Sequence, residues 1–158
     1  MLELYRVTFI GHSRIYGNLH LTDRIERIVS DLIRTKEFVE FYVGRNGDFD
    51  IYAASAVKAA QRALGNHNSY LTLVQPYPAK DDEYYEKYYD AIERPISPKI
   101  HPKGAITARN RWLIDNADLL IAYVEDGQPG GAMTALNYAK KRNLEILNLA
   151  TVQDEEEE

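Results

Sequence analysis

Between residues 4 and 150 the chain alternates short runs of β-branched and aromatic residues with amphipathic, helix-like segments. This alternation constrains the fold most strongly, because strands separated by helices build a parallel sheet that is covered on both faces. The strand-like segments are continuous apolar runs, which is the pattern of strands buried on both sides. The expected strands are 4–10, 38–43, 70–75, 118–124 and 145–149. The expected helices are 22–35, 50–64, 81–92, 107–116 and 132–142.

A length of 158 residues and a hydrophobic content of 45% suit one domain with a substantial core. We expect residues 1–150 to form this domain, of class α/β, with three layers and a mostly parallel sheet of about five strands. Thr22 is expected to cap the first helix. Pro95, Pro98 and Pro102 predict an irregular segment before the fourth helix.

The acidic residues are distributed unevenly along the chain. Residues 154–158 are all acidic; without them 19 acidic residues face 19 lysines and arginines, although the formal net charge of the whole chain is -5. A run of like charges is typical of a disordered tail, which we predict for residues 151–158. The neutral body has no basic stripe, which argues against a nucleic acid as the main partner.

No apolar run approaches the ~18 residues of a membrane span, and the N-terminus lacks the features of a signal peptide. We therefore expect a cytoplasmic protein without a membrane partner. The chain has no cysteine and four histidines. None of the histidines has the spacing of a metal site, so no metal is expected, and the sequence indicates no cofactor.

The stretch from Arg109 to Ala139 is the part of the chain most indicative of function. It combines a helix end, a buried strand, a glycine turn and a second helix. In an α/β protein this order places backbone N–H groups and a helix N-terminus at the carboxyl edge of the sheet, where anionic ligands bind.

Three strand-to-helix loops offer such positions, namely 11–14, 44–48 and 127–134. Glycine lets the backbone approach a phosphate or ribose closely, and the next helix supplies free N–H donors. Together the loops favour a nucleotide-like ligand. The chain has neither the Gly-Lys-Ser/Thr of a Walker loop nor a complete Gly-x-Gly-x-x-Gly, which argues against an ATPase and against a classical dehydrogenase.

Four segments carry a resemblance to known proteins: Thr-Phe-Ile-Gly-His at 8–12, Gly-Arg-Asn-Gly-Asp-Phe-Asp at 44–50, Ala-Arg-Asn-Arg at 108–111 with Asp118, and Gly-Gly-Ala-Met-Thr-Ala at 130–135. In this order they resemble the SLOG superfamily, which joins the Smf/DprA proteins and the cytokinin-activating LOG phosphoribohydrolases. The resemblance runs from Thr8 to Ala150 and is strongest to the small YpsA-like bacterial members. It implies a Rossmann-like domain that binds nucleotides or nucleotide-derived ligands, in a superfamily of enzymes, sensors and nucleic-acid binders.

The last of these segments resembles a motif of the LOG enzymes. Pro129-Gly130-Gly131 with Thr134 is similar to their Pro-Gly-Gly-x-Gly-Thr-x-x-Glu, whose glycines bind phosphate and whose glutamate acts in glycosidic cleavage. Met133 stands at the third glycine and Asn137 at the glutamate. These departures put catalysis in doubt more than they affect ligand binding.

The resemblance also extends to the expected helix 107–116 and to the second loop. Arg109 lies nine residues before Asp118, as the functional arginine of the LOG family lies before its aspartate. In the second loop, Asp48 stands where YpsA-like members often have glycine. The arginine is therefore expected at the site, and the second loop is expected to depart from the YpsA-like pattern.

The three loops and one helix supply the candidate site. The candidate ligand-binding residues are Gly11, His12, Ser13, Arg14, Gly44, Arg45, Asn46, Gly47, Asp48, Arg109, Gly130, Gly131 and Thr134. Asp48 and Asp50 are also candidates for a catalytic carboxylate, although no catalytic residue is assigned. Asp50 has a second possible role as the cap of its helix, and His12 as an ordinary hydrogen-bonded histidine.

Two classes of function fit these features. The favoured class is a protein that binds or senses a nucleotide or a nucleotide derivative. The alternative is an enzyme that cleaves or transfers at an N-glycosidic bond, such as a phosphoribohydrolase or a nucleoside deoxyribosyltransferase. Such an enzyme needs a carboxylate near the anomeric carbon, and the loops offer Asp48, Asp50, Glu125 and Asp126. Whether the chain is an enzyme stays open.

A cluster of tyrosines at 84, 85, 88 and 89 follows helical spacing. Such a face usually packs in a core or at a subunit interface, so we expect a homo-oligomer through this segment or a neighbouring helix. Two alternatives are that a ring stacks on a base, or that the segment, with Tyr77, forms a flap over the site.

Overall fold

The repeated unit of the fold is a strand followed by a helix that returns the chain to the same end of the sheet. The computed structural model describes residues 3–18 and 20–152, so most of the predicted acidic tail lies outside the described residues. The elements in chain order are β1 (Leu4–Gly11), α1 (Leu21–Thr35), β2 (Phe38–Val43), α2 (Asp48–Leu64), β3 (Ser69–Val74), α3 (Asp82–Tyr88), β4 (Ala91–Glu93), α4 (Pro102–Asp115), β5 (Leu119–Tyr123), α5 (Gly131–Lys141) and β6 (Glu145–Asn148). None of the helices in this part of the chain is both long and apolar enough to cross a membrane.

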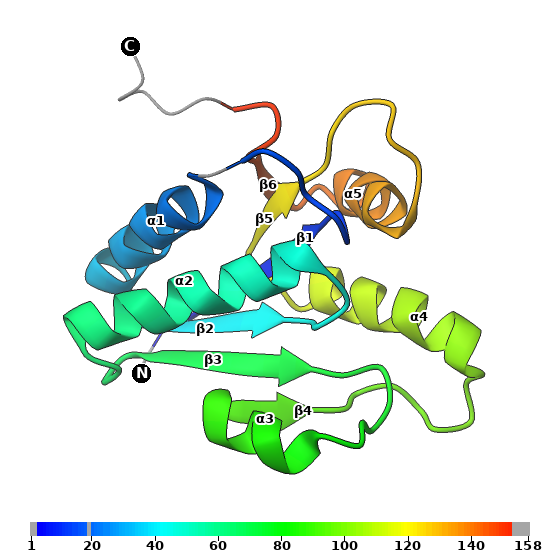
Figure 1. The fold of residues 1–158 in the computed structure, drawn as a ribbon, viewed down its shortest axis with the longest axis horizontal. Coiled ribbons are helices and arrows are strands. Elements are labelled where there is room, and N and C mark those ends of the chain that lie inside the picture. Colours follow the sequence, from blue (N-terminus) through cyan, green and yellow to red (C-terminus); the bar gives the residue numbers. More distant parts are fainter. Residues whose placement is uncertain (1–2, 19, 153–158) are drawn as a thin grey trace.

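The six strands formed by the described residues are all parallel, in the order β4-β3-β2-β1-β5-β6 (Figure 1). From β1 the chain first extends the sheet toward β4, and then crosses back to place β5 on the other side of β1. The order therefore reverses between β1 and β5. In open parallel sheets, ligands bind beyond the carboxyl ends of the strands at such a switch point. The predicted α/β class is confirmed, with one strand more than expected.

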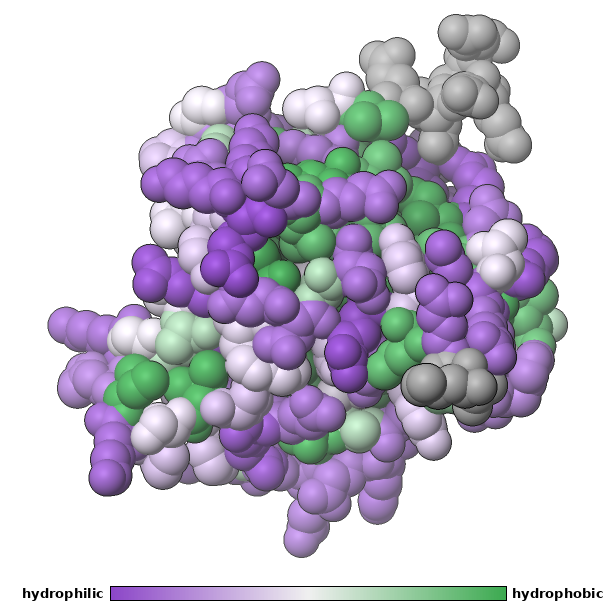
Figure 2. All heavy atoms as spheres, turned by 180° about the vertical axis from the view of Figure 1, so that it is seen from behind, coloured by the Kyte–Doolittle hydropathy of each residue, from purple (hydrophilic) through white to green (hydrophobic). Residues whose placement is uncertain are grey.

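Helices cover both faces of the sheet, because successive residues of a strand point to opposite sides. α1 and α2 pack together on one face, and α4 and α5 on the other (Figure 1). On the first face, Phe9 of β1 packs against Phe41 and Phe49, with ring centroids 6.2 and 6.4 Å away. On the second face, Ile10 packs with Leu120 and the apolar side of α5. From behind, apolar side chains appear as separate green areas between purple polar ones (Figure 2).

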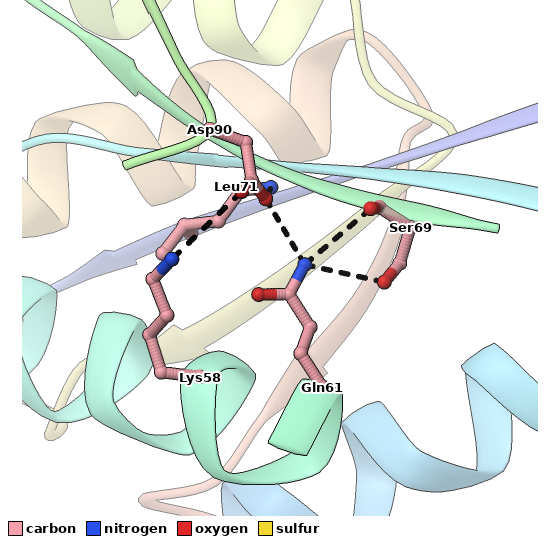
Figure 3. A network of polar contacts seen from close by, with 5 residues as sticks. All are labelled: Lys58, Gln61, Ser69, Leu71 and Asp90. Atoms are coloured by element: carbon pink, nitrogen blue, oxygen red, sulfur yellow. Dashed lines mark hydrogen bonds and ion pairs between the residues drawn. The ribbon is translucent and has the colours of Figure 1, made fainter. Parts of the chain in front are cut away.

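The short edge strand β4 is fixed to the sheet by a polar network at its beginning (Figure 3). The Asp90 carboxylate accepts hydrogen bonds from the backbone N–H of Leu71 (2.8 Å) and from the Gln61 side chain (3.0 Å). The Gln61 amide also donates to Ser69 Oγ (3.2 Å), and Lys58 Nζ lies 3.8 Å from the Asp90 carboxylate. Side chains of α2 thus hold both β3 and the start of β4.

The third helix is shorter than predicted. It ends at Tyr88 rather than at Ile92, because Ala91–Glu93 pairs with β3 as an additional parallel strand. The tyrosine spacing continues past the helix end, which is why helical periodicity alone extends it too far.

Each of the five expected helices starts one to five residues from its predicted position, and two of these starts overturn a predicted cap or irregular segment. α1 begins one residue before Thr22, with His20 at the N-cap, so Thr22 is not the cap. α4 begins at Pro102, five residues before the expected start, with His101 at the N-cap accepting the N–H of Lys103 (3.2 Å). Proline is favoured at a first helical position, so Pro102 starts a helix here instead of marking irregular structure.

Candidate functional site

A cavity of about 210 Å³ lies at the switch point between β1 and β5. Four parts of the chain line it: residues 9–13 at the end of β1, the turn into α2 between 44 and 50, one side of α4 between 106 and 113, and the turn 128–132 that leads into α5. Each of the three loops singled out in the sequence therefore contributes to one cavity.

Arg109 is the buried cation of this cavity, with 3% of its surface exposed. Its guanidinium donates to the Asn46 side-chain oxygen (2.7 Å) and to the Val74 carbonyl (3.0 Å), and its Nε donates to Asn110 (3.0 Å). Burial lowers the pKa of Arg109 from its ordinary value, and the charge of Asp50 opposes this effect. Arginine has more N–H donors than these three acceptors use, so the side chain is held in place and can still bind an anion.

Two glycines in the turn into α2 allow the close packing of the site. A Cβ built on Gly44 would lie 2.6 Å from Arg109 Nη1, and one built on Gly47 would lie 2.3 Å from the Cα of Ser13. Both distances are shorter than real Cβ atoms show, so a larger residue would displace the arginine or the first loop. The two glycines thus determine the shape of the cavity.

Asp50 is the acidic residue among the described residues that line the cavity. Its carboxylate accepts the N–H of Asn46 (2.9 Å), while the N-cap of α2 is Gly47, so Asp50 braces the turn rather than capping the helix. Burial raises the pKa of Asp50, whereas the Asn46 hydrogen bond and the Arg109 charge lower it. Asn46 therefore links the anionic and the cationic side chain of the cavity.

Asp48, the other candidate for a catalytic carboxylate, holds the first loop. Its Oδ2 accepts the N–H of Ile15 (3.0 Å), and its own N–H donates to the Ser13 carbonyl (2.8 Å). Asp48 is not among the residues that line the cavity. Of the two carboxylates considered, the structure brings Asp50 to the cavity.

His12 follows β1 and is largely buried, with 7% of its surface exposed. Its Nε2 accepts the N–H of Glu125 (2.8 Å), and its backbone N–H donates to the Tyr123 carbonyl (3.2 Å). Because Nε2 is an acceptor, the proton of the neutral ring lies on Nδ1. His12 therefore joins the first loop to the end of β5 while it lines the cavity.

The turn into α5 places backbone donors at the cavity. Gly130 has a φ of 141°, a conformation that favours glycine, and Gly131 begins the helix. A Cβ built on either residue would meet no atom within 4 Å. The Gly130 carbonyl accepts both the N–H and the hydroxyl of Thr134, each at 3.1 Å. The first N–H groups of a helix have no acceptor within it, so those of α5 are available to an anion.

Most of the predicted site residues meet at the cavity. These residues are Gly11, His12, Ser13, Gly44, Asn46, Gly47, Asp50, Arg109, Gly130 and Gly131. The other four lie elsewhere. Besides Asp48, Arg14 lines a neighbouring hollow with Glu125, and Thr134 lines a second cavity between α4 and α5. Arg45 lies over the ring of Tyr85, 4.8 Å from its centroid.

Sequence reasoning missed the wall that α4 contributes. Ile106 and Leu113 stand three residues before and four residues after Arg109, on the same face of the helix. This spacing could have identified both, once the arginine was singled out. Gln128 also lines the cavity, and no sequence signal distinguishes it. Within residues 3–18 and 20–152, no group of three or more His, Cys, Asp or Glu side chains is placed to hold a metal ion.

Comparison with known proteins rests on the fold. No family model matches the chain, and no curated protein matches it in sequence. One similar structure is DNA processing protein A from Helicobacter pylori, studied for its single-stranded DNA binding. It has a TM-score of 0.61 and 17% identity over 90% of this chain, which spans 63% of that protein. The fold is Rossmann-like.

A second similar structure is the molybdenum cofactor carrier protein MCP from Chlamydomonas reinhardtii. Its TM-score is also 0.61, with 13% identity over 94% of this chain and 78% of that chain. At these identities the two likenesses concern the fold alone.

Proposed function

We propose that the cavity binds an anionic group of a nucleotide or nucleotide derivative, and that the chain is a SLOG-type binding or sensing protein. The observation that carries this proposal is the meeting of Arg109 with the Gly130–Gly131 turn in one cavity at the switch point. An anion placed there would contact a buried guanidinium and the positive end of α5. Several of the residues that resemble the YpsA-like members also line this cavity, which supports the same assignment.

A small molecule is the first candidate for the partner. The similar Helicobacter pylori protein binds single-stranded DNA, which weakens the expectation that this chain has no nucleic-acid partner. The cation and the N–H donors line a single cavity, however, whereas binding of a strand needs a charged path with stacking platforms. We therefore place a nucleotide-derived ligand before a nucleic acid.

Replacement of Gly131 by aspartate tests the proposal. The added carboxylate would enter open space in the cavity and repel an anion, while a negative charge in the first turn of a helix does not weaken the helix. A ligand at a hundred times its Kd stabilises a protein by about 2.7 kcal/mol. We expect wild type to show a thermal shift with at least one member of a panel of mono- and dinucleotides, and Gly131→Asp to lose it at an unchanged melting temperature.

Gly131→Asn is the matched control, because it adds nearly the same volume without the charge and should keep part of the shift. Equal shifts for wild type and Gly131→Asp would overturn the proposal. Release of free base from AMP by wild type, abolished in Asp50→Asn, would favour the alternative of N-glycosidic cleavage. Asn137 does not support that alternative, since it is neutral and lies outside the cavity.

A further inference from the structure

A second cavity, of about 380 Å³, adjoins the first between α4 and α5. Three residues, Ile106, Asn110 and Gly131, line both cavities. Gly131 has no side chain and begins α5, so the N-terminus of this helix faces both spaces. The two cavities therefore form one continuous groove that starts at the anion position of the proposed function.

The groove follows one face of α5 along the whole helix. Its lining residues on that helix begin at Gly131 and end at Lys141, with Ala135 and Tyr138 between them at helical spacing. Ten steps along a helix span about 15 Å. A single phosphate group at the first anion position is therefore too small to reach the far end of the groove.

The far end is basic and the middle is neutral. Arg111 and Lys141 line the groove there, and both are exposed. The Arg111 guanidinium lies 5.4 Å from the ring centroid of Tyr138, and the Tyr138 hydroxyl donates to Asp115 (2.8 Å), so the ring supports the arginine at the rim. Among the described residues that line this second cavity, none is acidic. Both ends of the groove therefore attract anions.

We propose that the ligand carries a terminal anionic group at each of its two ends, one at the Gly130–Gly131 turn and one at Arg111 and Lys141. A linear dinucleotide with a 5′-phosphate and a 3′-phosphate has this chemistry, and its internal phosphodiester would lie over the middle of the groove, where the described lining residues are uncharged. A mononucleotide would occupy the first cavity and leave the basic end unused. This inference rests on the proposed function of the first cavity.

The test compares two ligands and two variants by calorimetry at low ionic strength. The ligands are a 5′-phosphorylated adenine dinucleotide with a 3′-phosphate and the same dinucleotide without it. Removal of one exposed cation from a phosphate costs about a factor of two to five in affinity. Lys141→Ala should therefore lower the affinity for the doubly phosphorylated ligand by about that factor. The double variant Arg111→Ala with Lys141→Ala should lower it by about ten-fold. Neither change should affect the ligand that lacks the 3′-phosphate.

Lys140→Ala is the matched control, because Lys140 is an exposed neighbour in the same helix turn that does not line the groove. It should change neither affinity. Equal affinities of wild type for both ligands, or equal losses for both in the double variant, would overturn the second anion position and leave the first intact. Absence of binding by both ligands would overturn the dinucleotide proposal, whereas the proposed function of the first cavity would still be decided by the thermal shifts with the panel of mono- and dinucleotides. A shift of the double variant from dimer to monomer in sedimentation would show that a second copy of the chain covers the groove, which also overturns the proposal.

Discussion

At the scale of single residues, the site depends on how Asn46 connects two charged side chains. Its backbone N–H binds Asp50, and its side-chain oxygen accepts from Arg109. The sequence pointed to Arg109 through its spacing from Asp118, and to Asn46 through the glycine turn. Their contact could not be predicted, because it joins positions 63 residues apart, and only the assembled sheet brings α4 to the turn into α2.

The raised pKa of Asp50 makes stability depend on pH in a defined direction. The unfolded chain loses this proton near the ordinary value of 3.8, whereas the folded protein retains it to higher pH. The folded state therefore binds more protons in this range, and stability falls as pH rises through it. Wild type should lose stability relative to Asp50→Asn between about pH 4 and the higher pKa of the folded state. Urea unfolding of both proteins at a series of pH values measures this difference.

Asp31 offers a control for the Asp50 experiment, since its side chain is 77% exposed and its ion pair with Arg34 is a surface contact. Asp31→Asn makes the same chemical change at the surface, and its effect on the free energy of unfolding should stay below about 1 kcal/mol. Parallel pH profiles for wild type and Asp50→Asn would contradict the raised pKa.

At the scale of elements, the sequence predicts most helices and strands better than it predicts the edge strand β4 and the start of α4. Apolar runs and helical periodicity indicate most strands and helices, because these signals are local. β4 has only three residues and forms by pairing with β3, so no local sequence pattern predicts it. α4 did carry a local signal, the proline at its first position, and the neighbouring prolines concealed it.

The attachment of β4 yields a prediction about Asp90. Its carboxylate satisfies the N–H of Leu71 and the amide of Gln61 together (Figure 3). Asp90→Ala leaves both donors without this acceptor, so the free energy of unfolding should fall by about 1–3 kcal/mol. Urea unfolding measures the loss. Hydrogen exchange should become faster at the N–H of Leu71 and across β4.

Lys58→Ala is the matched control for Asp90→Ala, because it removes the longer ion pair to the same carboxylate, together with the contact of Lys58 with the Tyr88 ring, and leaves both hydrogen bonds. Ion pairs near the surface contribute about 0–1 kcal/mol, so this variant should lose less stability. A larger loss in Lys58→Ala than in Asp90→Ala would mean that charge, and not the two hydrogen bonds, fixes the edge strand.

At the scale of the whole molecule, the sequence predicted that three loops meet, because parallel strands present their carboxyl ends at one edge of the sheet. It did not predict how the tyrosines are used. Tyr89 is buried and accepts a hydrogen bond from Arg45 (3.2 Å), and Lys58 lies 5.3 Å from the ring centroid of Tyr88. Cations from distant parts of the chain thus contact these tyrosines, which spacing along one helix cannot indicate.

Of the tyrosines in this segment, Tyr84 and Tyr77 remain available for the predicted homo-oligomer contact, with 65% and 45% of their surface exposed. Two rings bury a small area, and small interfaces give weak, transient association. We expect sedimentation equilibrium to show a monomer at low protein concentration and a dimer at protein concentrations on the order of hundreds of micromolar. Tyr84→Glu should abolish the dimer at an unchanged melting temperature, whereas Tyr16→Glu, at an 81% exposed position between β1 and α1, should not. A monomer at every concentration would exclude the oligomer, and a dimer that tolerates Tyr84→Glu would place the contact on another helix.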